Sequence, residues 1–313
     1  MKKKLVSIVC SFRNEELTIN ELINRIDKSL INLNDWEYEI IFVNDYSTDN
    51  SIKEIKKFFF NKKYNITLIN MSRNFGGHSC RIAGFEYASG EAVIYFDTDL
   101  QDPPEIFPEL IKKYQEGYDV VHTLRKKRLG ETKLKIFVTK LAYKIITFLS
   151  DINLKGESGD FKLLSRKVVN YILKFNESDP YLRGLSVWIG FRQYYYEYTR
   201  DPRKYGISQY SIIQAAPEFL RGVTSFSVKP LYLGIILGIF SVFVSFGLIV
   251  FSIIAKLLNT AVPGVSGILI AISFFSGVIM LNIGLLGIYV AKINNQVMGR
   301  PRYIIDNIQK SNE

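Results

Sequence analysis

The 313-residue sequence has only two cysteines, Cys10 and Cys80, and lacks the phosphate-binding signatures of common nucleotide folds. Two cysteines cannot form a disulfide framework, so we expect both to be small core residues in a reducing compartment. Neither a G-x-G-x-x-G run nor a Walker lysine motif occurs, which excludes the usual dehydrogenase and P-loop classes. Because the lysines at 2–4 lead straight into a strand-length apolar run, we expect no signal peptide.

Charge is absent from two long stretches in the C-terminal third, residues 230–255 and 257–291. Each is longer than the roughly 20 residues that a helix needs to cross a bilayer, so we predict two transmembrane helices. Pro263 and Gly264 interrupt the pattern and predict a turn at 259–267. The basic residues that flank the hairpin are Arg221, Lys229, Lys292, Arg300 and Arg302. Since the turn carries no charge, the positive-inside rule predicts two cytoplasmic termini; a buried helical hairpin in a soluble protein is the alternative.

The net charge of +10, beside 48% hydrophobic residues, indicates an anionic surface as partner, either a membrane or nucleic acid. The uncharged runs favour the membrane, so nucleic acid is not expected. Residues 133–149 place apolar side chains on one helical face and lysines among the rest. This pattern predicts an amphipathic helix lying on anionic lipid, with a solvated helix packed on the catalytic domain as the alternative.

The N-terminal two thirds of the chain alternate between apolar runs and helix-like segments. Four of the runs are strand-length, at 5–12, 39–43, 66–70 and 92–96. The alternation predicts an α/β fold with a Rossmann-like, mostly parallel sheet and helices on both faces. Ligands bind such sheets at the carboxyl ends of the strands, where Glu15, Asp45, Arg73 and Asp97 all fall. For each of these polar segments taken alone, a simple helix cap is the alternative interpretation. A fifth strand is predicted at 118–121.

Asp97 and Asp99 directly follow the buried run at 92–96. Residues i and i+2 of an extended chain share a face, so the two carboxylates point the same way. Such a pair can hold a hard divalent cation and leave positions for substrate phosphates. Asp102 is predicted to cap the next helix and Pro103 to open it. For an isolated Asp-x-Asp, a solvated surface turn is the alternative.

Two later segments carry further polar groups. Gly159 is predicted to permit a tight turn with Asp160 at its exit, where Asp160 serves the site or caps the following helix. Residues 200–206 form a basic, broken loop. Its guanidinium groups can clamp a phosphate at the bilayer surface or anchor the chain to anionic lipid.

Together these motifs resemble the polyprenyl-phosphate glycosyltransferases, inverting GT-A enzymes related to dolichol-phosphate mannose synthase. The likeness is greatest to the bacterial two-helix enzymes that make undecaprenyl-phosphate glucose or undecaprenyl-phosphate aminoarabinose. It spans nearly the whole chain and is carried by Asn14-Glu15, Phe42-Val43-Asn44-Asp45, Ser72-Arg73-Asn74-Phe75-Gly76, Asp97-Thr98-Asp99-Leu100-Gln101-Asp102-Pro103-Pro104-Glu105, Gly159-Asp160-Phe161, and Arg300-Pro301-Arg302-Tyr303.

The resemblance implies a GT-A catalytic domain with a C-terminal transmembrane hairpin in the bacterial inner (cytoplasmic) membrane. The catalytic domain and both termini would be cytoplasmic. The implied segments are the catalytic domain at 1–210, a juxtamembrane interfacial segment at 211–229, two transmembrane helices at 230–292 and a cytoplasmic tail at 293–313.

On the donor side, the resemblance implies nucleotide contacts from Glu15, Asp45, Arg73, Asp97 and Gln101. Asp97 and Asp99 would bind the diphosphate through Mg²⁺ or Mn²⁺, and Asp99 would be catalytic. On the acceptor side, Asp160 would act as base or orienting group. The implied ligands of the lipid phosphate are Arg125, Arg128, Arg200, Arg203 and Ser208.

The sequence departs from the family pattern at two places near these residues. Tyr46 stands where a glycine is usual, which puts a bulky ring beside the nucleotide. The loop at 206–210 lacks the usual carboxylate and lysine, which puts its acceptor contacts in doubt.

The implied reaction is transfer of a hexose from a UDP-sugar to undecaprenyl phosphate with inversion. Glucose is the first choice of sugar, and an amino or N-acetylated sugar is the alternative. A processive polysaccharide synthase would need more membrane helices and a Gln-x-x-Arg-Trp motif, which the sequence lacks. A non-catalytic membrane adaptor is the alternative of another class. The small residues Gly277, Gly284 and Gly287 would allow close helix packing and a homo-oligomer.

Overall fold

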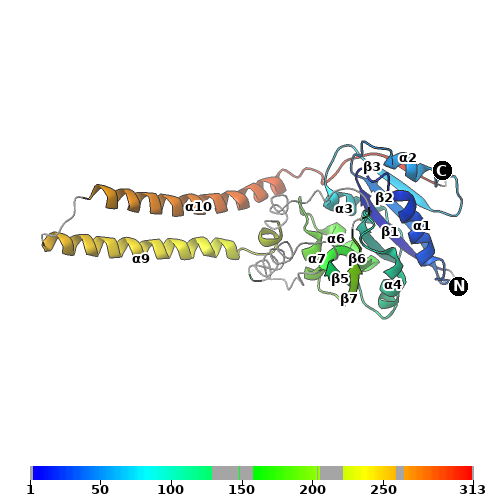
Figure 1. The fold of residues 1–313 in the computed structure, drawn as a ribbon, viewed down its shortest axis with the longest axis horizontal. Helices are drawn as coiled ribbons and strands as arrows, with labels where there is room; N and C mark the ends of the chain where they lie inside the picture. The colour runs from blue at the N-terminus through cyan, green and yellow to red at the C-terminus, as the bar shows by residue number, and fades with distance from the viewer. Residues whose placement is uncertain are drawn as a thin grey trace. The chain divides into compact units, whose positions relative to one another are not determined.

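The computed structural model describes residues 3–128, 148, 158–202, 204, 221–258 and 264–311. The chain divides into two compact units. One holds the α/β sheet together with the C-terminal residues from Pro301, and the other holds the two apolar helices within 223–300 (Figure 1). Apart from Phe148, the amphipathic helix predicted at 133–149 lies outside the described residues.

The described part of the first unit is built on an eight-stranded sheet of order β7-β5-β6-β4-β1-β2-β3-β8. Its strands are β1 (Lys4–Phe12), β2 (Trp36–Asn44), β3 (Ile66–Met71), β4 (Ala92–Asp97), β5 (Val120–Arg128), β6 (Ser158–Ser165), β7 (Gln193–Arg200) and β8 (Ile305–Lys310). The central strands β4, β1, β2 and β3 are parallel, as are β5 and β7, whereas β6 and β8 run antiparallel to their neighbours. The predicted mostly parallel α/β sheet is confirmed.

Helices cover both faces of this sheet. They are α1 (Ile19–Leu30), α2 (Ser51–Lys56), α3 (Gly77–Tyr87), the 3₁₀ turn η1 (Pro104–Ile106), α4 (Phe107–Gln115), α6 (Arg166–Lys174) and α7 (Leu182–Trp188). The apolar side of α1 joins one core with Ile8 and Cys10 of β1. On the opposite face of β1, a Cβ at Gly84 of α3 would lie 2.3 Å from a methyl of Val9. Only glycine therefore allows α3 to approach the sheet so closely.

Three local predictions are wrong. The fifth strand does not end at 121, because β5 continues through the basic run to Arg128. Gly159 and Asp160 do not form a turn or a cap, since both lie within β6, and the side chain of Ser165 caps α6 instead. Asp102 does not cap a helix either: the residue before η1 is Pro103, and Asp102 is buried.

The C-terminal strand β8 was not predicted from the sequence. It pairs antiparallel with β3 at the edge of the sheet, with Ile308 opposite Ile69. Asn70 donates a side-chain hydrogen bond to Asn307 at 2.8 Å. The segment that follows the second apolar helix along the chain is thus part of the α/β unit.

The second unit contains α9 (Lys229–Leu257) and α10 (Val265–Val297), which contact each other. Segments Lys229–Ala255 and Ile270–Val297 are long and apolar enough to cross a membrane, with mean hydropathies of 2.6 and 2.0. Almost none of either segment is buried within the protein. Among the described residues, a Cβ at Gly277, Gly284 or Gly287 would meet nothing within 4 Å. These glycines therefore do not mediate the contact between α9 and α10.

Candidate active site

The loops that leave three neighbouring strands are strained. Asn14, Tyr46 and Leu100 follow β1, β2 and β4, and their φ angles are 56°, 62° and 60°. In an L-residue this left-handed conformation is costly, and Tyr and Leu gain no local compensation of the kind that Asn can make. Strained backbone of this kind clusters at functional sites, so it marks the carboxyl edge of β4, β1 and β2.

Replacing Tyr46 by glycine should make the protein more stable than replacing it by alanine, by about 1 kcal/mol. Both variants lose a ring that is already 52% exposed, but only glycine accepts a φ of 62° without strain. Thermal unfolding midpoints of the two variants in the same detergent check this. Equal midpoints would show that the left-handed backbone at Tyr46 carries no cost.

The expected nucleotide residues Glu15 and Asp45 lie in adjacent loops. The backbone N–H of Glu15 donates to the Ser51 hydroxyl at 2.8 Å. The Asp45 carboxylate accepts backbone N–H groups from Phe75 at 2.7 Å and from Gly76 at 3.0 Å. Asp45 thus ties the loop after β2 to the loop after β3. Arg73, in the latter loop, is exposed and stacks its guanidinium 4.1 Å from the Phe75 ring centroid.

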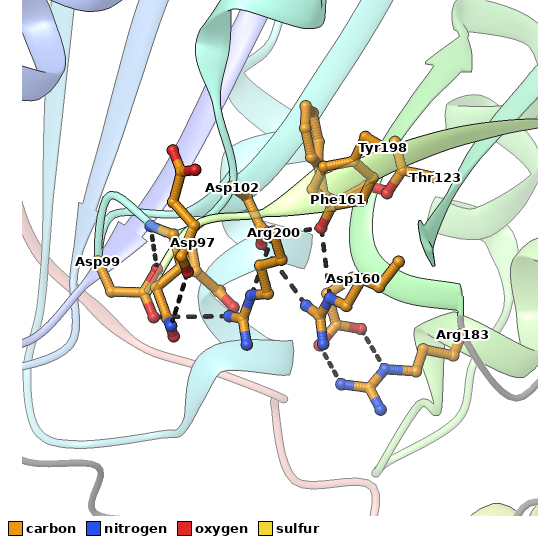
Figure 2. A network of polar contacts seen from close by, with 12 residues as sticks. Asp97, Asp99, Asp102, Thr123, Asp160, Phe161, Arg183, Tyr198 and Arg200 are labelled. Atoms are coloured by element: carbon orange, nitrogen blue, oxygen red, sulfur yellow. Dashed lines mark hydrogen bonds and ion pairs between the residues drawn. The ribbon is translucent and has the colours of Figure 1, made fainter. Parts of the chain in front are cut away.

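Asp97 and Asp99 stand at the end of β4, where Figure 2 shows them side by side with Arg200. Thr98 between them is buried, while both carboxylates are partly exposed. Asp99 accepts the Gln101 backbone N–H at 3.2 Å, and its other oxygen is 3.6 Å from Arg200 Nη2. Burial and the neighbouring charge of Asp97 raise the pKa of Asp99 to about 6, against the opposing effect of Arg200.

Asp102 is the buried junction of a second group. Its carboxylate accepts the hydroxyl of Tyr198 and Arg200 Nε, the latter at 3.2 Å, and lies 3.6 Å from Arg125 Nη2. A carboxylate that is only 1% exposed depends on such hydrogen-bonding and cationic partners, because burial removes it from water. The structure therefore brings the expected phosphate ligands Arg125 and Arg200 together through Asp102.

Asp160 lies inside β6, and Figure 2 shows Arg183 beside its carboxylate. Arg183 of α7 makes two hydrogen bonds to it, at 2.7 and 2.6 Å. Arg81 of α3 approaches the same carboxylate at 3.4 Å and also donates to Asp97 at 2.7 Å. Burial works against ionisation, but Arg183 and Arg81 outweigh it and hold the pKa of Asp160 well below its usual range. Asp160 is therefore an ionised anchor and a weak base.

Gly159 has a packing role in place of the predicted turn. A Cβ at this position would lie 2.7 Å from Arg125 Nη2. The absence of a side chain at Gly159 leaves space for the Arg125 guanidinium to lie against β6 and reach Asp102. A glycine next to a site residue in the sequence thus marks close approach by a functional group.

Of the other residues expected to bind the lipid phosphate or the nucleotide, some lie outside the described part of the chain. Arg128 ends β5. Arg203 and Ser208 lie outside the described residues. Gln101 turns its side-chain amide to the Asp201 carbonyl at 3.2 Å, which fastens the Asp99 loop to the segment after β7.

Arg81, Arg183 and Asp102 are the site residues that sequence reasoning missed or misassigned. Arg81 sits among the buried residues of α3, and its side chain is 8% exposed. The sequence does contain a signal for Arg81, because it is the one charged residue among the apolar residues and glycine that α3 buries. A buried arginine needs a charged partner, so its position there indicates an ion pair. Arg183 offered no comparable signal.

Lys162 lies two positions after Asp160 in β6 and is fully buried. Its ammonium donates to the Ser186 hydroxyl of α7 at 2.6 Å. Burial lowers its pKa to about 7, although Asp160 partly compensates.

Replacing Lys162 by methionine should remove a pH dependence of stability. Between pH 7 and pH 10.5 the unfolded chain binds a proton at Lys162 that the folded protein has released. The wild type should therefore gain stability relative to Lys162→Met as pH rises through this window, by up to about 1.4 kcal/mol per pH unit. Unfolding midpoints of both proteins at pH 7 and pH 9 measure the difference. Parallel pH profiles would contradict it.

The carboxylates at the end of β4 suit a hard divalent cation. Among the described residues no group of three or more His, Cys, Asp or Glu side chains is placed to hold a metal. A pair of carboxylates is nevertheless a usual Mg²⁺ donor set when substrate phosphates complete the shell. Burial and, after it, the charge of Asp97 raise the pKa of Asp99, and a cation between the two carboxylates would relieve their repulsion.

Comparison with known proteins identifies the family. The model of "Glycosyl transferase family 2" matches residues 7–173. The chain is 38% identical to the uncharacterized glycosyltransferase sll0501 of Synechocystis, over 97% of this chain and 95% of that protein. It is 34% identical to the SfII prophage-derived bactoprenol glucosyl transferase of Shigella flexneri, over 98% of this chain and 99% of that protein. The chain therefore belongs to glycosyl transferase family 2.

Proposed function

We propose that the protein transfers a hexose, with glucose as the first candidate, from a UDP-sugar to undecaprenyl phosphate. The reaction would take place at the cytoplasmic face of the bacterial inner membrane and invert the anomeric centre. The observation that carries the proposal is the meeting of four aspartates and four arginines at one sheet edge. These residues are Asp97, Asp99, Asp102, Asp160, Arg81, Arg125, Arg183 and Arg200. The nearly full-length likeness to a bactoprenol glucosyl transferase supports the acceptor.

The donor side is formed by the loops after β1, β2 and β4. Glu15 and Asp45 would bind the nucleoside, and Asp97 and Asp99 would hold Mg²⁺ or Mn²⁺ against the diphosphate. When bound, the cation neutralises charge that develops on the leaving UDP. Arg200 lies 3.6 Å from Asp99 and would be free to move onto an oxygen of the lipid phosphate once that carboxylate has a metal partner.

The acceptor side is formed by β5, β6, β7 and α7. Arg125 and Arg200 would orient the lipid phosphate, since both already converge on one carboxylate. A phosphate oxygen attacks the anomeric carbon from the face opposite UDP. The new carbon–oxygen bond forms as the bond to the diphosphate breaks, and UDP leaves with the electron pair.

No strong base is required in this reaction. A phosphate monoester has a second pKa near 6, so it is largely deprotonated at neutral pH. This agrees with an Asp160 whose pKa is held well below its usual range. We assign Asp160 a positioning role: it fixes the guanidinium groups of Arg81 and Arg183 beside the reaction centre.

The test is acceptor-dependent release of UDP. Purified protein in detergent is given Mn²⁺ and a panel of UDP-sugars that includes glucose, amino and N-acetylated forms, with and without undecaprenyl phosphate. Release of UDP from one donor only when the lipid is present is the expected result, and the donor identifies the sugar. Release that is independent of the lipid contradicts the acceptor, and absence of release from every donor favours the membrane adaptor.

A further inference from the structure

Aromatic and basic side chains lie together on a surface formed by α6, α7 and the loop before β7. Trp188 and Tyr171 are 59% and 46% exposed. Trp188 packs on Phe175 with ring centroids 5.5 Å apart, and Tyr171 packs on Phe191 at 5.6 Å. Lys174 Nζ lies 5.4 Å from the Tyr171 ring, and Lys167 Nζ lies 4.0 Å from that of Phe191. We call this set of six residues the α6–α7 surface.

The composition of the α6–α7 surface is that of a membrane interface. Trp and Tyr are enriched at the headgroup level, where one end of the ring is apolar and the other is wet. Lysines keep their ammonium groups at anionic headgroups while their stems cover apolar surface. Contiguous exposed apolar groups rimmed by polar residues are typical of protein or membrane interaction sites.

Residues on both flanks of the apolar hairpin in the sequence contact α6 and the segment that joins it to α7. Arg221, eight positions before the first residue of α9, donates to the Asp179 carboxylate at 2.7 Å. Arg302, five positions after the last residue of α10, donates to the Phe175 carbonyl. Both contacts lie within the α/β unit, at the two points where the chain leaves this unit for the hairpin and returns to it.

We propose that the α6–α7 surface is a second membrane contact of the catalytic unit, seated at the level of anionic lipid headgroups. Trp188 and Tyr171 reach the acyl boundary, and Lys167 and Lys174 pair with lipid phosphates. The inference rests on the proposed function in one respect: the reaction takes place at a membrane surface.

This contact would link the bilayer to the reaction centre through a single short helix. Trp188 is the last residue of α7, and Arg183, which holds Asp160, is in its first turn. Five residues of helix span only about 7.5 Å. Ser186, between them, binds Lys162 beside Asp160. The same helix, α7, would then both contact the headgroups and position the side chains that receive the lipid phosphate.

The sequence provides its own control, because its only two tryptophans are Trp36 and Trp188. Trp36 starts β2, is 6% exposed and packs on Tyr114. We would place full-length Trp36→Phe, Trp188→Phe and wild-type protein in nanodiscs that contain phosphatidylglycerol brominated near the top of the acyl chain. Loss of fluorescence intensity relative to unbrominated lipid is measured for each protein.

The expected result is a loss of Trp188 fluorescence in Trp36→Phe and no loss in Trp188→Phe, with the wild type in between. Trp188 unquenched by brominated lipid but accessible to aqueous acrylamide would overturn the proposal. Trp188 shielded from both quenchers would also overturn it and would indicate a second copy of the chain on this surface. Because quenching requires no turnover, its failure is distinguishable from failure of acceptor-dependent UDP release.

A charge test separates lipid pairing from aromatic insertion alone. Lys167→Glu combined with Lys174→Glu should reduce quenching in phosphatidylglycerol nanodiscs and have a smaller effect in phosphatidylcholine. The matched control is Lys28→Glu with Lys112→Glu, two exposed lysines on α1 and α4. Equal effects of the two pairs would refute a specific role for the α6–α7 lysines.

Discussion

Replacing Asp99 by asparagine should abolish cation-dependent nucleotide binding and lower turnover by at least about 10²- to 10³-fold. The amide can still accept the Gln101 N–H that Asp99 accepts at 3.2 Å, so the loop should keep its shape. What is lost is the second negative charge at the end of β4, without which Asp97 alone binds a divalent cation weakly.

Titration calorimetry with UDP, in the presence and absence of Mn²⁺, measures this effect. Glu105→Gln is the matched control, because Glu105 belongs to the same sequence motif but pairs with Arg25. It should bind UDP as the wild type does. Unaltered Mn²⁺-dependent UDP binding by Asp99→Asn would contradict a metal site at Asp99.

Replacing Asp160 by asparagine should lower turnover by about 10²-fold or more while nucleotide affinity changes little. The carboxylate contacts Arg183 and Arg81, and within the described part of the chain it is linked to the donor side through Arg81, which also contacts Asp97. Without its charge, the guanidinium groups of buried Arg81 and partly exposed Arg183 lose their fixed orientation at the acceptor side.

The same substitution leaves buried positive charge uncompensated, and this should destabilise the protein by roughly 3–5 kcal/mol. The double variant Asp160→Asn with Arg183→Gln removes one charge of each sign and should recover much of that stability without recovering turnover. A large loss of UDP affinity in either variant would contradict an acceptor-side role for Asp160. Recovery of turnover along with stability would show that Asp160 acts only in folding.

The strands that carry the donor loops were predictable because they are buried on both faces. Continuous apolar runs such as Ala92–Phe96 need both faces covered, and this requirement selects a parallel sheet between helices. Their carboxyl ends then share one edge whatever the details of the loops. Asp45 and Asp97 could be assigned to this edge from the sequence for that reason.

The acceptor side was harder to predict because its elements are antiparallel or lie at the sheet edge. In β6, Gly159 suggested a turn with Asp160 at its exit, but both residues lie within the strand. At the opposite edge of the sheet, β8 has only two apolar residues, Ile305 and Ile308, and is stabilised by pairing with β3, which no local pattern reports. Long-range partners also decide the ion pairs of Arg81 with Asp97 and Asp160, which are 16 and 79 positions away along the chain.

We infer that this sheet edge joins a sugar to a lipid phosphate with loss of UDP. The most direct test is mass spectrometry of the lipid formed from undecaprenyl phosphate and the active UDP-sugar, together with identification of the released nucleotide. We expect a lipid heavier by one hexose residue, a single phosphate in the product, and UDP as the leaving group. A diphosphate-linked sugar with release of UMP would instead show sugar-phosphate transfer and contradict it.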